Sequence, residues 1–325
     1  MTTIVKLSPS QITFRAIKSK TILESALESD VVLEYSCKSG SCGMCESVLI
    51  TGEVSDKQEN IYKAGQRFLA CQCKPTSDEL TIEAEYYPEL AEIMQKIVPC
   101  KVSSTDITAD EYIIIKFRLP PSASFAFLPG QYINLHYQGI VRSYSIANSN
   151  AQDGIELHIR RVNRGAMSGL LFNNLSTNTL MRLEGPLGTF FVREDIRPII
   201  FLAGGTGFAP VKSMVEKLIQ QDSKRDIHIY WGMHNGSGFY SDLPMEWANK
   251  YENIHYVPVV SGEDSLWSGR KGFVHNAVVE DYHNLSTFAV YACGSPTMIA
   301  AAKADFIKKG LSGKHFFSDA FTESK

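Results

Sequence analysis

Three cysteines close together in the sequence constrain this chain more than any other feature. Cys37, Cys42 and Cys45 follow the spacing C-x4-C-x2-C. This spacing is typical of a [2Fe–2S] cluster, which needs a fourth thiolate from further along the chain. Gly40 and Gly43 lie between the cysteines, so that backbone amides can turn toward the sulfur atoms and stabilise the more negative, reduced cluster. The sequence therefore predicts an iron–sulfur site.

The fourth ligand is Cys71 or Cys73, the next cysteines along the chain. A zinc site and a group of buried free thiols are the alternatives. Zinc sites usually pair two C-x2–4-C units, whereas a single residue separates Cys71 from Cys73. Cys100 and Cys293 stand alone, and this distribution is not that of a disulfide framework.

Length and composition describe a globular protein of two or three domains, with 325 residues, of which 44% are apolar and 21% charged. A net charge of −3 gives no signature of nucleic-acid binding. The first residues lack the pattern of a signal peptide, and the longest uncharged stretch, Pro198–Val211, is too short and glycine-rich to span a bilayer. We expect a cytoplasmic protein with no nucleic-acid or membrane partner.

Residues 1–90 have the pattern of a compact β-rich domain with one helix. Residues 3–14 alternate around a Ser-Pro-Ser turn, which indicates a hairpin. Thr21 and Glu24 form a capping box that begins a short helix. We expect strands at Val31–Leu33 and Leu80–Ala84, and a linker over Tyr86–Val98.

Two further domains follow, with different patterns. Short strands separated by Pro-Gly, Gly and Asn turns predict an antiparallel β-barrel over residues 97–194. In residues 196–325, apolar strands such as Ile199–Ala203 alternate with helices, which predicts a parallel α/β sheet. The other expected strands are Tyr112–Arg118, Tyr132–Tyr137, Ile155–Val162, Leu180–Leu183, Ile227–Trp231, His255–Val260 and Phe288–Tyr291. The expected helices are one containing Val211–Leu218 and one spanning Thr297–Lys309.

Within the predicted barrel, a Pro-Gly-Gln-Tyr turn at 129–132 precedes the sequence Arg142-Ser-Tyr144-Ser145. This order resembles the flavin-binding barrel of the ferredoxin–NADP reductase superfamily. The resemblance implies that Arg142 pairs with a flavin phosphate, Tyr144 offers an aromatic face and Ser145 reaches the reactive N5. Short Arg/Tyr/Ser strands are common by themselves, so this motif indicates a flavin site only together with further motifs in the expected order.

Two such motifs follow: a second turn and the end of the barrel. Gly165-Ala-Met167-Ser168 lies where this superfamily places another phosphate-binding turn, and Glu184–Gly188 closes the barrel. The resemblance implies FAD rather than FMN.

A glycine-rich turn follows the buried strand Ile199–Ala203 and precedes a helix. Its residues are Gly204, Gly205, Thr206 and Gly207. Glycines at such a turn let a dinucleotide pyrophosphate approach the backbone and the helix N-terminus. Tight packing between strand and helix is the alternative, but G-G-T-G-x-A-P is the variant found in the same superfamily.

A second nicotinamide motif lies at the end of another buried strand. Tyr291-Ala-Cys293-Gly294-Ser295-Pro-Thr-Met298 resembles the superfamily's C-G-P-P-x-M, with Ser295 in place of the first proline. The resemblance implies that Cys293, Gly294 and Met298 contact the nicotinamide and that Cys293 helps to align it for hydride transfer. Without this context, Cys293 would be interpreted as a lone buried cysteine.

Two further interpretations concern the C-terminus and the choice of cofactor. Phe321 can cover the flavin and Asp319 can tune or protonate N5; a terminal strand with core-facing phenylalanines is the equal alternative. The strand that should face the adenosine ribose ends in Glu263-Asp264, which is acidic where a 2′-phosphate requires a cation. We therefore predict NADH rather than NADPH.

Over nearly its whole length the sequence resembles the CDP-6-deoxy-Δ3,4-glucoseen reductase family of 3,6-dideoxyhexose and lipopolysaccharide O-antigen biosynthesis. The stretches that carry this resemblance are Ile97–Lys101, Phe127–Leu135, Arg142–Asn148, Glu184–Phe191, Phe201–Glu216, Ile229–Met233, His255–Gly262 and Phe316–Phe321. The family has an N-terminal plant-type ferredoxin domain of the β-grasp fold. In such domains the fourth ligand lies four residues before a proline, which selects Cys71 before Pro75.

The resemblance also implies a function. Two electrons enter from NADH as a hydride, FAD divides the pair, and the cluster carries single electrons to a partner. That partner is a dehydrase that uses pyridoxamine phosphate (PMP) and its own [2Fe–2S] cluster to remove the C3 hydroxyl of a CDP-6-deoxy-4-hexulose. The alternative is the reductase component of a mono- or dioxygenase. A simple electron carrier, or a reductase that releases free flavin, is disfavoured because it would leave the nucleotide motifs or the cluster domain without a purpose.

Overall fold

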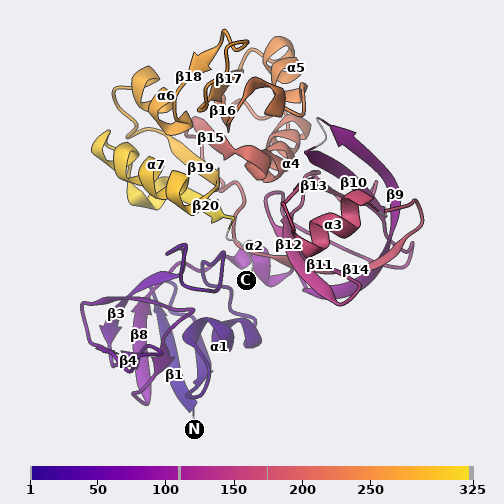
Figure 1. The fold of residues 1–325 in the computed structure, drawn as a ribbon. Coiled ribbons are helices and arrows are strands. Elements are labelled where there is room, and N and C mark those ends of the chain that lie inside the picture. Colours follow the sequence, from indigo (N-terminus) through magenta and orange to yellow (C-terminus); the bar gives the residue numbers. More distant parts are fainter. Residues whose placement is uncertain (1, 109–110, 174, 322–325) are drawn as a thin grey trace. The chain divides into compact units, whose positions relative to one another are not determined.

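The computed structural model describes residues 2–108, 111–173 and 175–321, which form two compact units, Met1–Met94 and Gln95–Lys325 (Figure 1). The first unit is a β-grasp domain: a five-stranded sheet of order β2-β1-β8-β3-β6, in which only β1 and β8 pair in parallel. Helix α1 buries Ile22, Leu23 and Ala26 in the core of this unit. The elements are β1 (Thr2–Ser8), β2 (Thr13–Ile17), α1 (Ile22–Glu28), β3 (Glu46–Thr51), β4 (Val54–Ser55), β5 (Ile61–Tyr62), β6 (Arg67–Leu69), β7 (Lys74–Pro75), β8 (Glu79–Glu83) and α2 (Pro88–Ala91).

The local predictions for this unit are mostly confirmed. The β1–β2 hairpin forms, and α1 begins with the expected capping box: the Thr21 hydroxyl accepts from the Glu24 N–H at 3.2 Å, and the Glu24 carboxylate accepts from the Thr21 N–H at 2.8 Å. The predicted strand Val31–Leu33 is wrong. Val31 and Leu33 are buried in the core and Val32 is partly buried against it, but only Leu33 makes a backbone bridge, to Tyr86, because the chain turns here into the cysteine loop.

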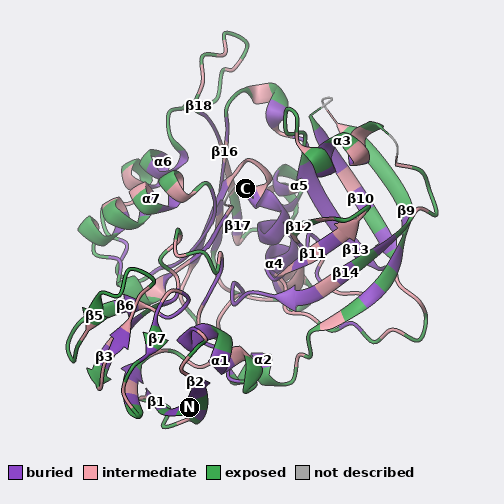
Figure 2. Cartoon of the chain, turned by 60° about the horizontal axis from the view of Figure 1, so that its bottom comes forward, coloured by how far each residue is buried: buried purple, intermediate pink, exposed green. Residues whose placement is uncertain are grey.

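The second unit begins with the predicted antiparallel barrel, of strand order β12-β11-β14-β9-β10-β13. A backbone bridge from Ile146 to Leu157 joins the two outermost strands and closes the barrel. Helix α3 contributes Met167 and Leu171 to the barrel core, and Figure 2 shows the second half of β9 exposed. The elements are β9 (Lys96–Thr108), β10 (Tyr112–Arg118), β11 (Tyr132–Tyr137), β12 (Ile140–Ser145), β13 (Ile155–Arg160), α3 (Ala166–Asn173) and β14 (Leu180–Leu187).

Two barrel strands end elsewhere than predicted. Strand β13 stops at Arg160 rather than at Val162, because the Val162 N–H donates to the Ser168 hydroxyl at 2.9 Å instead of to a neighbouring strand. Strand β14 continues four residues beyond Leu183, to Leu187, because its second half pairs with β11 as far as Tyr132.

The rest of the second unit is the predicted parallel sheet, of order β18-β17-β16-β15-β19-β20. Helices α6 and α7 lie on one face and α4 and α5 on the other (Figures 1 and 2). Strand β15 lies between β16 and β19, so the strand order reverses between β15 and β19, and ligands of open α/β sheets bind at the carboxyl ends of strands at such a point. The elements are β15 (Ile199–Gly204), α4 (Phe208–Gln220), β16 (Ile227–Met233), α5 (Leu243–Lys250), β17 (Ile254–Val260), β18 (Arg270–Lys271), α6 (Val274–Asp281), β19 (Ala289–Gly294), α7 (Pro296–Lys308) and β20 (Phe316–Ala320), with short 3-10 turns at Gly205–Gly207, Gly236–Gly238 and Gly313–His315.

A buried lysine joins the parallel sheet's helix α4 to the barrel. The Lys212 ammonium lies 3.0 Å from Glu156 of β13 and 2.6 Å from Glu216, and donates to the Ala147 carbonyl at 3.1 Å. Burial opposes ionisation of Glu156, but a hydrogen bond from His158 and the charge of Lys212 outweigh it and lower its pKa to about 2. The ion pair therefore contributes stability above the ordinary pKa of 4.5 and loses it only as the pH falls toward 2.

The same contact continues on both sides of the ion pair. His158 lies 3.1 Å from the hydroxyl of Tyr240, whose ring stacks on Tyr112 of the barrel at 4.6 Å. On the other side, the Ser213 hydroxyl donates to the Asn148 carbonyl at 2.7 Å. A polar cavity of about 400 Å³ opens beside Lys212.

We predict that Lys212→Met destabilises the second unit by about 3 to 5 kcal/mol, because it removes the buried cation nearest to buried Glu156 and leaves that carboxylate only the more distant, exposed Lys116 at 3.5 Å. Lys217→Met is the control, since Lys217 lies on the same helix, half-buried, and pairs with no carboxylate among the described residues. Calorimetric unfolding of the full-length protein measures both. Equal, small shifts for the two variants would contradict the role of the ion pair.

Candidate functional site

The loop between α1 and β3 brings three cysteine sulfurs toward a fourth. Cys45 and Cys71 are buried and their sulfur atoms lie 3.1 Å apart. Cys37 and Cys42, both half-buried, form a second hydrogen-bonded pair. The hydrogen bond from the Cys42 thiol outweighs burial and lowers the pKa of Cys37 to about 3. The four thiols thus form two pairs.

Backbone amides turn toward these sulfurs, as the glycines of the loop suggest. The Ser39 N–H donates to the Cys37 sulfur at 3.4 Å, and the amides of Gly40 and Met44 reach the sulfurs of Cys71 and Cys42. Positive φ angles of 84° at Gly40 and 73° at Gly43 make this path possible.

The thiol pairs fit a binuclear cluster better than a single ion. Two irons bridged by sulfide take two thiolates each, which is the grouping that these four cysteines offer. Within the described ranges, no three Cys, His, Asp or Glu side chains are arranged to hold one metal ion. Binding would remove the protons that the paired thiols share.

Cys73 is placed differently from Cys71. Its side chain is buried in the hydrophobic core of the first unit, and burial raises its pKa to about 11. Its backbone carbonyl accepts from the N–H of Ile22, the first residue of α1. The Cys73 side chain therefore packs in the core, whereas the Cys71 sulfur lies against that of Cys45.

We predict that Cys71→Ser removes the cluster and that Cys73→Ser keeps it. The physical reason is that only Cys71 brings its sulfur to the other three, while serine at position 73 replaces a core thiol. Iron and acid-labile sulfide content, with the visible absorbance of the cluster, measure the outcome. A full cluster in Cys71→Ser would contradict the ligand choice.

The three residues of the flavin motif lie in sequence at the end of β12. The Arg142 guanidinium donates to the Val141 carbonyl at 2.8 Å, and no carboxylate of the described residues pairs with it. Burial raises the pKa of Tyr144 to about 12, so its phenol stays protonated. Ser145 is 6% exposed, and its hydroxyl has no hydrogen-bond partner within the described part of the chain. A guanidinium that pairs with no carboxylate of the described residues, and a serine hydroxyl with no hydrogen-bond partner among them, fit a flavin's phosphate and ring.

The turn at Gly165 has a narrower role than the sequence suggested. The Met167 side chain is buried in the barrel core, so only its backbone can face a ligand. The Ser168 hydroxyl already accepts from the Val162 N–H, which leaves its own O–H as a donor. Gly165 packs closely on Val162, because a Cβ there would lie 2.9 Å from the Val162 Cβ.

The two nicotinamide motifs meet where β15 and β19 end side by side. A Cβ at Gly207 would lie 2.2 Å from the Cys293 carbonyl oxygen, so the turn and the end of β19 touch through bare backbone. Met298 packs its sulfur over Gly204 and its terminal methyl over Gly294, where added Cβ atoms would come within 2.7 and 2.9 Å of these atoms. The sequence placed these motifs on separate strands, and the parallel pairing of β15 with β19 brings them together.

The other side of the glycine turn is open and fixed in position. Apart from its chain neighbours, none of the described residues has an atom within 4 Å of where a Gly205 Cβ would be, although the φ of +57° at Gly205 disfavours other residues. The Trp231 indole donates to the Gly205 carbonyl at 2.9 Å and stacks on Phe208 at 4.2 Å. Thr206 is half-buried beside them. This open, rigid turn at the N-terminus of α4 suits a pyrophosphate.

Cys293 is fully buried at the end of β19, and burial together with the charge of Asp319 raises its pKa well above the ordinary value. Asp319 lies beside it on β20, in register, and is itself buried. Phe321 packs on the same core while its N–H donates to the Gly294 carbonyl at 2.8 Å. Ser295, the departure from the family motif, caps α7 by accepting from the Met298 N–H at 3.2 Å.

In the acidic loop that we predict to face the ribose, only one of the two carboxylates, that of Asp264, has hydrogen bonds that hold the loop. Asp264 accepts from the N–H groups of Gly236 at 2.8 Å and Leu266 at 2.9 Å, so it organises the loop, whereas Glu263 is exposed. The Lys271 ammonium, which the sequence argument did not include, donates to the Asp264 carbonyl at 3.3 Å. Strand pairing of β18 with β17 brings this cation to the loop.

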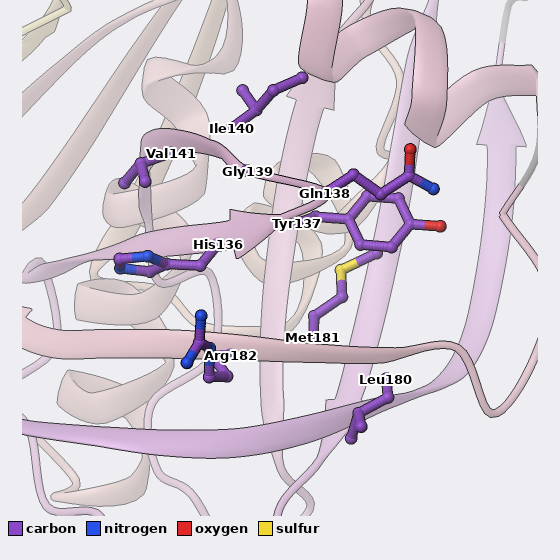
Figure 3. A pocket seen from close by; sticks show the side chains of 9 residues that line it. All are labelled: His136, Tyr137, Gln138, Gly139, Ile140, Val141, Leu180, Met181 and Arg182. Atoms are coloured by element: carbon purple, nitrogen blue, oxygen red, sulfur yellow. The ribbon is translucent and has the colours of Figure 1, made fainter.

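A cavity of about 310 Å³ lies beside the β11–β12 hairpin and β14 (Figure 3). Figure 3 shows Tyr137 and Met181 side by side, with His136 and Arg182 next to them. None of the predicted flavin or nicotinamide residues lines it.

Comparison with known proteins identifies three domains along the chain. Residues 5–76 match a 2Fe-2S iron-sulfur cluster binding domain, residues 99–192 an oxidoreductase FAD-binding domain and residues 201–304 an oxidoreductase NAD-binding domain. Among the described helices, none has the length and apolar character needed to cross a membrane.

Full-length relatives decide the family. The chain is 56% identical to protein RfbI of Salmonella typhimurium, over 100% of this chain and 98% of the relative. It is 53% identical to the CDP-6-deoxy-L-threo-D-glycero-4-hexulose-3-dehydrase reductase of Yersinia pseudotuberculosis, over 99% of both chains. The chain belongs to this dehydrase reductase family. It is an oxidoreductase of the ferredoxin–NADP reductase superfamily, with [2Fe–2S], FAD and NAD domains.

A solved structure supports the architecture of the dehydrase reductase family member. The cytochrome P450 reductase GcoB of Amycolatopsis superposes with a TM-score of 0.79 at 27% identity, covering 99% of this chain and 100% of that one. The predicted multidomain fold is confirmed.

Proposed function

We propose that this chain carries electrons from NADH through FAD and its [2Fe–2S] cluster to a partner 3-dehydrase that deoxygenates C3 of a CDP-6-deoxy-4-hexulose. The observation that carries this proposal is the likeness to the Yersinia dehydrase reductase, at 53% identity over all three domains. We assign residues 1–90, 97–194 and 196–325 to the cluster, flavin and nicotinamide domains. The partner uses PMP and its own [2Fe–2S] cluster, and the use of NADH places the reaction in the cytoplasm.

When bound, FAD accepts a hydride and releases single electrons, which is the form in which the cluster carries them. The protein's part is to bind and to orient. Arg142 would hold a flavin phosphate, the Tyr144 ring would pack against the flavin, and the Ser145 hydroxyl would donate toward N5. Helix α4 offers its first amides to the pyrophosphate of NADH at the Gly204–Gly207 turn.

At the nicotinamide, exclusion of water matters as much as contact. Cys293 and Asp319 are buried, and Phe321 packs against the hydrophobic core that contains Cys293, so we expect Phe321 to move aside when the nicotinamide of NADH approaches Cys293. Cys293 stays a neutral thiol there, since its pKa is raised, and can pack against the nicotinamide without adding charge. The charge of Asp319 is a second cause of that raised pKa, after burial.

The electron count fixes what must be observed with the partner. Replacing the C3–OH of the dehydrase-bound sugar by C3–H consumes one NADH and one proton and releases NAD⁺ and water, and the cluster would pass the two electrons on one at a time. We predict one NADH consumed per deoxygenated sugar when the chain is mixed anaerobically with a purified PMP-dependent 3-dehydrase and its substrate. The Cys37→Ser variant, which lacks a cluster ligand, should retain NADH-dependent dye reduction but lose this coupling.

An oxygenase reductase is the other candidate, because GcoB, a cytochrome P450 reductase, has the same architecture. The matching assay replaces the dehydrase with an oxygenase component. Coupled turnover with the oxygenase and none with the dehydrase would overturn the proposed partner while leaving the electron path intact.

We predict a kcat/KM for NADH about tenfold or more above that for NADPH, equivalent to about 1.4 kcal/mol, because Glu263 and Asp264 repel a 2′-phosphate. Glu263→Arg should narrow the ratio, since Glu263 is exposed and not used by the loop. Glu252→Arg, at another exposed position of the same domain, should leave it unchanged. A clear preference of the wild type for NADPH, assisted by Lys271, would contradict the prediction.

A further inference from the structure

One side chain reaches across the cysteine loop from the segment that carries the fourth thiol. The Gln72 amide nitrogen lies 3.2 Å from the Cys71 sulfur, 2.9 Å from the Cys71 carbonyl and 3.3 Å from the Lys38 carbonyl. Gln72 is half-buried, between Cys71 and Cys73 in the sequence. Its amide therefore joins the two pieces of chain that hold the cluster ligands.

The position of Gln72 is determined from two sides. Its backbone N–H and that of Cys73 both donate to the Leu69 carbonyl, at 2.9 and 3.0 Å, which fixes the turn. Its side chain lies against Gly40, where a Cβ would come within 2.9 Å of the Gln72 Cγ. The absence of a side chain at Gly40 is what lets the amide lie flat over the loop.

An N–H group aimed at a ligand sulfur has a defined effect on an iron–sulfur cluster. Reduction adds negative charge that spreads onto the sulfurs, so a donor hydrogen bond stabilises the reduced form and raises the reduction potential. Most donors in this loop are backbone amides, which mutation cannot remove. Gln72 is a side-chain donor, and Ser41 offers a second and longer one, with its Oγ 3.7 Å from the Cys37 sulfur.

We propose that Gln72 sets the reduction potential of the cluster through its side-chain hydrogen bond to Cys71, and so makes the cluster a better acceptor for electrons from the flavin. Gln72 is a tuning residue and not a ligand. The proposal rests on the cluster ligands assigned above and is independent of the partner that receives the electrons.

The test is a redox titration of the full-length, cofactor-loaded protein, followed by electron paramagnetic resonance of the reduced cluster. Gln72→Leu keeps the bulk and removes the donor, so the midpoint potential should fall. A roughly tenfold change in the reduction equilibrium corresponds to 59 mV for one electron. Gln72→Glu, which removes the donor and adds charge, should lower it further. Gln58→Leu, an exposed glutamine of the same unit, should leave it unchanged.

The outcomes separate the possibilities. A full cluster in Gln72→Leu with an unchanged potential would overturn the proposal. If Gln72→Leu assembles no cluster, the wild-type protein is measured instead, with its glutamine side chains labelled with ¹⁵N. The proposal predicts a hyperfine coupling between this ¹⁵N and the reduced cluster, and the absence of the coupling would overturn it. A wild type without any [2Fe–2S] signal would instead refute the ligand assignment itself.

Discussion

Hydride transfer needs two cofactors in contact, and in this chain they bind to different halves of one unit. Lys212 and Ser213 of α4 hold the carbonyls of Ala147 and Asn148, which lie two and three residues beyond Ser145. Helix α4 begins at the glycine turn, so these bonds tie the helix that follows this turn to the segment just after the strand that carries the predicted flavin motif. The buried charge of Lys212 has partners both in the barrel and on α4. Electrostatics as well as packing therefore fixes the distance between the predicted flavin site and the glycine turn.

In the first unit, the cysteine loop must bind the cluster and also let it exchange electrons. A cluster must be held firmly by thiolates and yet exchange single electrons, and the loop meets both needs with two thiol pairs and several amides directed at sulfur. Cys45 and Cys71 are buried while Cys37 and Cys42 are half-buried, so one side of the group is closer to solvent than the other. The order of domains along the chain, cluster then flavin then nicotinamide, is the reverse of the order in which electrons pass.

Much of this could be predicted from the sequence because it is local. The Thr21–Glu24 capping box and the strand Tyr112–Arg118 each depend on neighbouring residues, and the structure has both as expected. The parallel sheet followed from apolar strands alternating with helices. The strand at Val31–Leu33 was wrong for a related reason: apolar residues predict burial, and burial does not require a neighbouring strand.

What the sequence could not provide are contacts between distant segments. Lys212 looked like one more lysine of an amphipathic helix, and its carboxylate partner Glu156 lies 56 positions earlier in the chain. Lys271 reaches the ribose loop only because β18 pairs with β17. The role of Gln72 depends on its contacts with Gly40 and Lys38, which lie more than thirty positions away. The sequence likewise could not show that two backbone amides donate to Asp264.

The central claim is that electrons pass within one chain from NADH to the cluster. Rapid anaerobic mixing of the holoprotein with NADH, followed by flavin absorbance and by freeze-quenched paramagnetic resonance of the cluster, tests it most directly. The account predicts that the cluster is reduced after the flavin, with a first-order rate that does not change with protein concentration. A cluster that stays oxidised beside a reduced flavin, or one whose reduction rate rises in proportion to protein concentration, would contradict it.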